Sequence, residues 1–138
     1  CVRADASIEE GWFYEGGGIY RHVWLNVTNP VHIAENGIFV STELNGDFTK
    51  AQLNVSADIK NSSVNDIMSG TDNGDYKIRH TVIDAGGREI TNSGDKPWNG
   101  DCMAQGTVTS QCNQMTVDNP HLWSVSTPYI YILRTELL

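Results

Sequence analysis

Residues 52–60 read Gln-Leu-Asn-Val-Ser-Ala-Asp-Ile-Lys, in which polar and apolar side chains alternate without a break. Every second residue from Leu53 to Ile59 is apolar, and in an extended strand these side chains would all point to one side. The same alternation occurs upstream in residues 38–44 and downstream in residues 76–82. No segment keeps apolar residues at the helical spacing through three turns. The pattern predicts strands with one buried face.

Further strand patterns follow toward the C-terminus. They are weak in residues 107–109 and 114–117, and strong in residues 129–137, which are rich in β-branched and aromatic side chains. Clusters of Gly, Asn and Asp separate the strands, and residues 70–75 and 92–102 are predicted to be loops. Short strands joined by such turns predict an all-β fold, an antiparallel β-sandwich.

Charge and length exclude several classes of protein. The 138 residues include 9 Lys and Arg against 17 Asp and Glu, which gives a formal net charge of −8. This charge argues against nucleic acid or an anionic membrane as a partner. The sequence has no run of 18 apolar residues, and its N-terminus lacks the order of a signal peptide. A (β/α)₈ barrel needs about 250 residues and does not fit.

The cysteines are Cys1, Cys102 and Cys112, an odd number without the spacing of a zinc site. Cys102 and Cys112 would form a disulfide if neighbouring strands brought their Cα atoms within about 7 Å. The alternative is two free, partly buried thiols. Three Asn-x-Ser/Thr triplets, one of them at Asn61, also arise by chance in Asn- and Ser-rich β-proteins, and they do not fix the compartment.

The first thirty residues differ in character from the rest. Residues 11–21 combine three consecutive aromatic residues with three consecutive glycines, which let a backbone bend sharply. Asn29-Pro30 closes the segment, because the residue before a proline is pushed out of the helical region. We predict a domain boundary at about residues 25–30.

Motifs at both ends of the chain resemble glycoside hydrolase family 2. Residues 18–25 (Gly-Ile-Tyr-Arg-His-Val-Trp-Leu) and 29–33 (Asn-Pro-Val-His-Ile) are similar to that family's junction between a jelly-roll sugar-binding domain and an immunoglobulin-like sandwich. Residues 118–124 (Asp-Asn-Pro-His-Leu-Trp-Ser) and 128–133 (Pro-Tyr-Ile-Tyr-Ile-Leu) resemble a second family pattern. The motif residues that carry the resemblance are Gly18, Tyr20, Arg21, Asn29, Pro30, Asn119, Pro120 and Trp123.

The resemblance implies a division of the chain. Residues 1–27 would be the end of the jelly-roll sugar-binding domain and the junction, and residues 28–138 an immunoglobulin-like β-sandwich that ends before its last strand. The family's two catalytic glutamates lie on a barrel that follows the sandwich, so the resemblance implies no catalytic residue, no metal and no cofactor in this chain. Its partners would be other domains of the same chain and, through the parent enzyme, carbohydrate.

The leading functional hypothesis is a non-catalytic module that positions the sugar-binding domain and the barrel relative to each other. The resemblance implies a retaining β-galactosidase as the parent, and β-glucuronidase and β-mannosidase stay open. The competing hypothesis is a free-standing carbohydrate-binding or adhesion module, because the fold alone does not exclude it. A periplasmic or secreted location is favoured over the cytoplasm.

One loop is a candidate substrate-proximal site. Glu9 and Glu10 carry clustered carboxylates, and Trp12 and Tyr14 offer faces on which a sugar could stack. By family resemblance this loop would reach the active-site mouth of the adjoining barrel. The alternative is a solvated acidic loop whose aromatic residues pack at a domain interface.

Other conspicuous residues are expected to be structural. The four histidines lie on different elements, which favours hydrogen-bonded structural roles over a metal site: His22, His32, His80 and His121. Trp123 is expected to pack in the sandwich core. Asp72 and Asp75 resemble half of a calcium loop but lack the full ligand series, so a solvated loop is expected.

The final strand raises a question of association. If residues 129–137 form the penultimate strand of the sandwich, their outer edge is open and rich in β-prone, uncharged side chains. Exposed edges of this kind pair with other chains or aggregate. We therefore predict that the isolated chain either dimerises through this edge or is poorly soluble.

Overall fold

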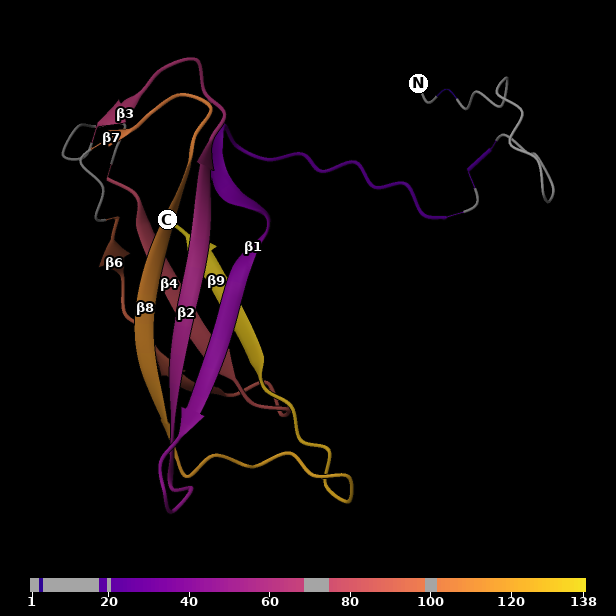
Figure 1. The fold of residues 1–138 in the computed structure, drawn as a ribbon, viewed down its shortest axis with the longest axis vertical. Coiled ribbons are helices and arrows are strands. Elements are labelled where there is room, and N and C mark those ends of the chain that lie inside the picture. The colour runs from indigo at the N-terminus through magenta and orange to yellow at the C-terminus, as the bar shows by residue number, and fades with distance from the viewer. Residues whose placement is uncertain (1–2, 4–17, 20, 69–74, 99–101) are drawn as a thin grey trace.

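The computed structural model describes residues 3, 18–19, 21–68, 75–98 and 102–138. These residues form β-strands joined by turns and loops and contain no helix (Figure 1). Accordingly, no helix long and apolar enough to cross a membrane occurs in the described part of the chain. The all-β prediction is confirmed.

The first sheet consists of three long antiparallel strands. These are β1 (Val31–Leu44), β2 (Lys50–Asn61) and β8 (Val108–Asp118), in the order β1-β2-β8. The two weak strand patterns near the C-terminus are thus parts of one continuous strand, β8. Its register with β2 runs unbroken from Lys50 opposite Asp118 to Lys60 opposite Val108.

A bulge interrupts the pairing of β1 with β2 between Ile33 and Ile38. Asn36 takes a φ of 54° there, and Gly37 follows it. A Cβ on Gly37 would lie 2.8 Å from the carbonyl oxygen of Ala34, so only glycine fits without a shift of the backbone.

The second sheet is built around β4 (Lys77–Ile83). Strand β9 (Ile132–Leu137) pairs along one side of β4, while β5 (Glu89–Asn92) and β6 (Lys96–Pro97) pair on the other. A separate ribbon joins β3 (Ile67–Met68) to β7 (Cys102–Met103).

Two expectations about the strands are corrected by the structure. The final strand begins at Ile132 rather than residue 129, and the segment predicted to be a loop contains β6, which is too short to leave an alternating pattern.

The core between the sheets consists of two apolar clusters. As the alternation predicts, Val55, Ala57 and Ile59 of β2 point inward and are fully buried. One cluster comprises Val31, Ala57, Ile59, Ile67, Ile78, Trp98 and Met103. The other comprises Ala51, Val55, Val82, Met115 and Val117. Among the tryptophans that the structure describes, Trp98 lies in the core and is 4% exposed. The core position expected for Trp123 is wrong, because that residue is 61% exposed.

The sandwich has two ends that carry different features (Figure 1). At the arm end, where residues 21–30 join β1, Ser62 N–H donates to the Pro30 carbonyl over 2.8 Å, and Leu138 exchanges two backbone hydrogen bonds with Lys77. At the loop end lie the turn of residues 45–49, the hairpin of residues 84–88 and the loop of residues 119–131. The two ends present separate surfaces.

Candidate functional site

The arm, residues 21–30, presents apolar side chains to solvent. Val23, Trp24, Leu25 and Val27 are each between 62% and 89% exposed. The His22 ring stacks on the Trp24 indole with centroids 5.7 Å apart. A run of exposed apolar side chains of this kind marks an interaction surface.

The Asn29-Pro30 motif attaches the arm to the sandwich. His32 Nδ1 lies 2.9 Å from the Asn29 carbonyl oxygen. The Pro30 carbonyl accepts the hydrogen bond from Ser62 N–H. This bond ties the backbone just before β1 to the backbone just after β2. The candidate loop residues Glu9, Glu10, Trp12 and Tyr14 lie outside the described residues, as do Tyr20, Asp72 and the aromatic–glycine run up to residue 17. Gly18 and Arg21 are described and exposed.

Asn61, at the end of β2, is a buried hydrogen-bonding centre that the sequence does not reveal. Its side chain has no exposed surface. Nδ2 donates to the carbonyl oxygens of Asn65 and Met103 over 2.9 Å each. Oδ1 accepts from the Ser63 N–H over 2.9 Å and from the Ser63 hydroxyl over 2.6 Å. A fully bonded, buried amide leaves no room for a glycan on the folded chain.

The Asn119-Pro120 motif turns the chain out of β8. Asn119 adopts a φ of 47°, a conformation that Asn tolerates better than most residues. Its N–H donates to the Thr49 carbonyl over 2.6 Å. The residues that follow therefore cross the loop end instead of entering either sheet, which is why Trp123 lies outside the core.

Aromatic rings gather in this loop. The His121 ring lies 4.7 Å from the Tyr129 ring, and the Tyr129 ring lies 5.0 Å from Tyr131 in an edge-to-face arrangement. His121 N–H donates to the Tyr131 hydroxyl over 2.9 Å, and Ala85 N–H donates to the Tyr129 hydroxyl over 3.4 Å. These contacts hold the loop against the hairpin of residues 84–88.

A groove of about 410 Å³ opens between this loop and the edges of the two sheets. The strands β1 and β9, which lie at the open edges of their sheets, form its walls. Most of its lining is apolar, and it includes Val40, Leu44, Leu53, Leu122, Trp123, Tyr131 and Leu133. The groove and residues 119–131 together are called the loop-end face below.

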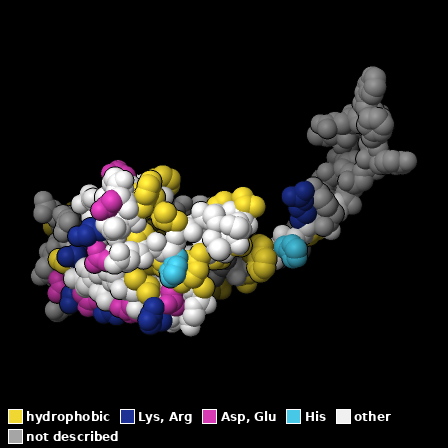
Figure 2. Space-filling model, turned by 90° about the horizontal axis from the view of Figure 1, so that it is seen from below, with side chains coloured by type: hydrophobic (Ala, Val, Ile, Leu, Met, Phe, Trp, Pro, Cys, Tyr) yellow, Lys and Arg dark blue, Asp and Glu magenta, His cyan; other side chains and the backbone are white. Residues whose placement is uncertain are grey.

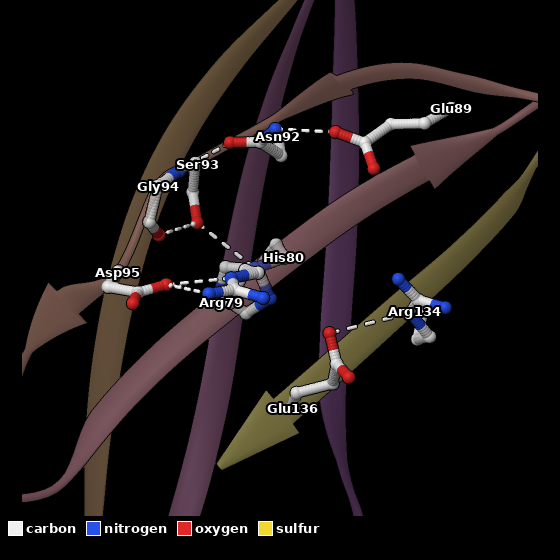
Figure 3. A network of polar contacts seen from close by, with 9 residues as sticks. All are labelled: Arg79, His80, Glu89, Asn92, Ser93, Gly94, Asp95, Arg134 and Glu136. Carbon is white, nitrogen blue, oxygen red and sulfur yellow. Dashed lines mark hydrogen bonds and ion pairs between the residues drawn. The ribbon is translucent and has the colours of Figure 1, made fainter. Parts of the chain in front are cut away.

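Two ion pairs lie on the second sheet, away from the loop-end face (Figure 3). Arg79 contacts Asp95 at 2.6 Å, and Arg134 contacts Glu136 at 3.4 Å. The backbone N–H groups of Arg88 and Gly86, together with the Arg88 guanidinium, hold the pKa of Asp84 below its usual value. The described residues contain no group of three or more His, Cys, Asp and Glu side chains that could hold a metal ion.

His80 lies fully buried between the two apolar clusters. Asn113 Nδ2 donates to its Nε2 over 3.1 Å, so Nδ1 carries the proton and donates to the Thr135 hydroxyl over 2.9 Å. Burial lowers the pKa of His80. The hydrogen-bonded structural role predicted for this histidine is confirmed.

The two described cysteines are free and exposed. Cys102 lies on β7 and pairs with Met68, whereas Cys112 lies on β8 opposite Ser56. The possible disulfide between Cys102 and Cys112 is absent from the structure, since both cysteines are free. The alternative of two free thiols agrees with the structure, although both thiols are exposed rather than partly buried.

Comparison with known proteins gives a consistent result. The family model described as glycosyl hydrolases family 2 matches residues 31–138. A β-galactosidase of Bacteroides ovatus is 33% identical over the whole of this chain, which spans 15% of that relative. A putative β-glucuronidase of Formosa agariphila is 30% identical over the whole chain, which spans 12% of it.

Solved structures agree in fold. A β-glucuronidase of Bacteroides uniformis superposes with a TM-score of 0.70 and 25% identity, over 93% of this chain and 15% of that one. A β-glucuronidase of glycoside hydrolase family 2 superposes with a TM-score of 0.66 and 19% identity, over 80% of this chain and 11% of that one.

Proposed function

This chain belongs to glycosyl hydrolase family 2, and from that membership we propose that it is a non-catalytic β-sandwich domain that positions other domains of a larger glycosidase. The observation that carries the proposal is the presence of exposed apolar side chains at both ends of the sandwich. Trp24 and Leu25 lie on the arm, and Trp123 lies at the loop end. Surfaces of this kind favour contacts with other folded units.

We propose the following domain arrangement. Residues 1–27 are the end of a jelly-roll sugar-binding domain with its junction, and residues 28–138 are the sandwich, whose last strand lies beyond Leu138. Two observations support a further strand. First, among the described strands β9 pairs only with β4, so the outer edge of β9 is open. Second, the apolar groove lies between β9 and β1.

The parent activity that we propose is retaining hydrolysis of β-galactosides. Support comes from the relatives named β-galactosidase in Bacteroides ovatus and Priestia megaterium, of which this chain spans 15% and 12%. The putative β-glucuronidase relative keeps glucuronides in the set of substrates to assay, and β-mannosides complete it. Carbohydrate is then a partner of the parent enzyme, while the sandwich contacts the neighbouring domains.

The test compares variants of the full-length protein. Replacing Trp24 and Leu25 by Ser should remove apolar contacts of the arm and lower kcat on an aryl β-galactoside by about 10- to 100-fold, because small displacements of positioned groups are costly. Phe39→Ser, at a residue on the outer face of β1 that is 69% exposed, is the matched control and should leave kcat unchanged. An arm variant that folds and keeps the kcat of the unmodified enzyme contradicts the positioning role.

A free-standing carbohydrate-binding module is the second candidate, and the exposed Trp123 beside an aromatic-lined groove favours it. Calorimetry with galactosides on the 138-residue chain discriminates between the two. Binding at millimolar concentration or tighter supports the binding module, whereas no heat of binding supports the positioning domain.

A further inference from the structure

The dipeptide Asn-Gly occurs four times in the chain, at residues 36–37, 45–46, 73–74 and 99–100. In such a pair the main-chain nitrogen of the glycine can attack the side-chain amide of the asparagine, and no Cβ on the glycine hinders the approach. The last two pairs lie outside the described residues. The structure therefore permits a comparison of Asn36 with Asn45, two asparagines that have the same successor and different surroundings.

Asn45 is held by the turn between β1 and β2. Its Nδ2 donates to the Thr49 hydroxyl over 3.0 Å, and its Oδ1 accepts from the Lys50 N–H over 2.8 Å. Its own N–H donates to the Lys50 carbonyl over 3.1 Å, and its carbonyl accepts from the Phe48 N–H over 3.0 Å. The side chain must break two hydrogen bonds before its Cγ can approach the Gly46 nitrogen.

Asn36 has none of these restraints. It lies in the bulge of β1, where residues 34–37 stand opposite Asp58 alone in the pairing with β2. The residue is exposed, and its side chain makes no hydrogen bond to any residue that the structure describes. Gly37 is buried against Ala34 and Asp58. A bulged segment is not held by the regular ladder of hydrogen bonds, so an opening of the bulge alone exposes the Gly37 nitrogen.

We propose that Asn36 is a site of spontaneous deamidation by water. The Gly37 main-chain nitrogen loses its proton to a base from solvent and forms a bond to Asn36 Cγ. The bond from Cγ to Nδ2 breaks, and the leaving group takes up a proton and departs as ammonia. The resulting cyclic imide adds water at either of its carbonyl carbons and opens to aspartate or isoaspartate. The net reaction consumes water, releases ammonia and involves no oxidant or reductant.

The modification changes the start of β1. Either product places a negative charge at position 36, next to Glu35. Asp58 is also close, because its Cβ lies 3.0 Å from the position that a Cβ on Gly37 would take. Like charges at such short range repel. Isoaspartate in addition lengthens the main chain by a carbon atom, since the chain then runs through the former side chain.

Both changes weaken the pairing of residues 31–33 with β2, which is separated from the rest of the β1–β2 ladder by the bulge. The arm joins the sandwich at these residues and projects away from it (Figure 2). Deamidation of Asn36 therefore loosens the attachment of the arm.

The test of the site is peptide mapping by mass spectrometry of the full-length protein during incubation in mildly alkaline buffer. Conversion of amide to acid should be at least about tenfold faster at Asn36 than at Asn45, because Asn45 must first break two hydrogen bonds. In urea that unfolds the protein, the two residues should react at similar rates, since only the fold protects Asn45. Equal rates in the folded protein overturn the proposal, and so does reaction of Asn36 only after unfolding.

Hydrogen exchange tests the consequence for β1. The backbone N–H groups of residues 31–33 should exchange faster in the converted protein than before incubation. Asn36→Gly is the matched control, because glycine adopts the positive φ of this position and has no side-chain amide to lose. This variant should show the same exchange before and after incubation. Unchanged exchange in the converted protein overturns the loosening of β1, and an equal rise in Asn36→Gly overturns it by assigning the change to another residue.

Discussion

Replacing Asn61 by Ala should destabilise the sandwich far more than its small change in volume suggests. The side chain is fully buried and makes four hydrogen bonds at the arm end. Its partners include the carbonyl of Met103, a residue that is itself fully buried and lies 42 positions away in the sequence. Asn61 therefore joins the end of β2 to the β3–β7 ribbon.

The loss of unfolding free energy depends on which hydrogen-bonding partners of Asn61 can find another partner in the variant. Water and the Asn65 carbonyl, which already lies 2.7 Å from the Ser63 hydroxyl, can replace the bonds to Ser63. The Met103 carbonyl is buried and cannot be solvated. An ordinary hydrogen bond contributes a net of about 1 kcal/mol, and a buried polar group left without a partner costs about 1–3 kcal/mol. Together these contributions predict that Asn61→Ala lowers the free energy of unfolding by roughly 3 kcal/mol. For a domain of this size such a loss lowers Tm by about 10 °C.

The assay is thermal unfolding followed by circular dichroism, with Asn54→Ala as the matched control. Asn54 lies on the same strand, but its side chain makes a single exposed hydrogen bond to Gln114 at 2.8 Å. That variant should stay within about 0.5 kcal/mol of the unmodified chain. If Asn61→Ala and Asn54→Ala lower Tm by the same small amount, the buried bonds of Asn61 do not carry the stability assigned to them.

Three further predictions concern pH, thiols and association. Burial lowers the pKa of His80 from 6.5. Between the folded pKa and 6.5 the unfolded chain binds more protons, so the free energy of unfolding in urea should fall as pH drops below about 6.5. His80→Gln should remove this slope, and a variant that keeps it would exclude His80 as the cause. Cys102 and Cys112 should both react with a thiol reagent without reductant or denaturant, and failure of either to react would contradict the free, exposed thiols. The short chain should self-associate or precipitate through the open edge of β9, and Ile132→Lys should suppress this; a stable monomer at about 100 µM refutes the prediction.

The sequence predicts the long strands well because alternation is a local property. In β2 the apolar face read from residues 52–60 is the buried face, since Val55, Ala57 and Ile59 have no exposed surface. A shift of one residue would turn that face to solvent, so burial on one side fixes the register. Strands of two residues, such as β6, carry no such pattern and are found only in the folded chain.

Single residues without periodic neighbours are predicted poorly. Trp98 directly follows β6, and its N–H donates to the Tyr76 carbonyl over 2.9 Å, which holds it against the core. The turn at Asn119 instead carries Trp123 outside both sheets. Contacts distant in sequence are equally hidden, as the pairing of Asn61 with Met103 illustrates. At the candidate site, the family resemblance of the end motifs points to the arm and to the loop of residues 119–131. It does not predict that side chains in these segments are exposed to solvent.

The proposed positioning role requires a sandwich that resists deformation between its ends, and the buried polar contacts of this sandwich would oppose such deformation. His80 of β4 is hydrogen-bonded to Asn113 of β8 in one sheet and to Thr135 of β9 in its own. It lies between the arm-end and loop-end apolar clusters. Apolar side chains tolerate sliding because their contacts are non-directional, whereas a hydrogen bond weakens steeply when its geometry changes. Shear between the sheets would break the contact between His80 and Asn113 and leave buried polar atoms without partners. The unbroken register of β2 with β8 stiffens the first sheet along its length. We therefore expect that a displacement imposed at the loop end is transmitted to the arm end rather than absorbed within the sandwich.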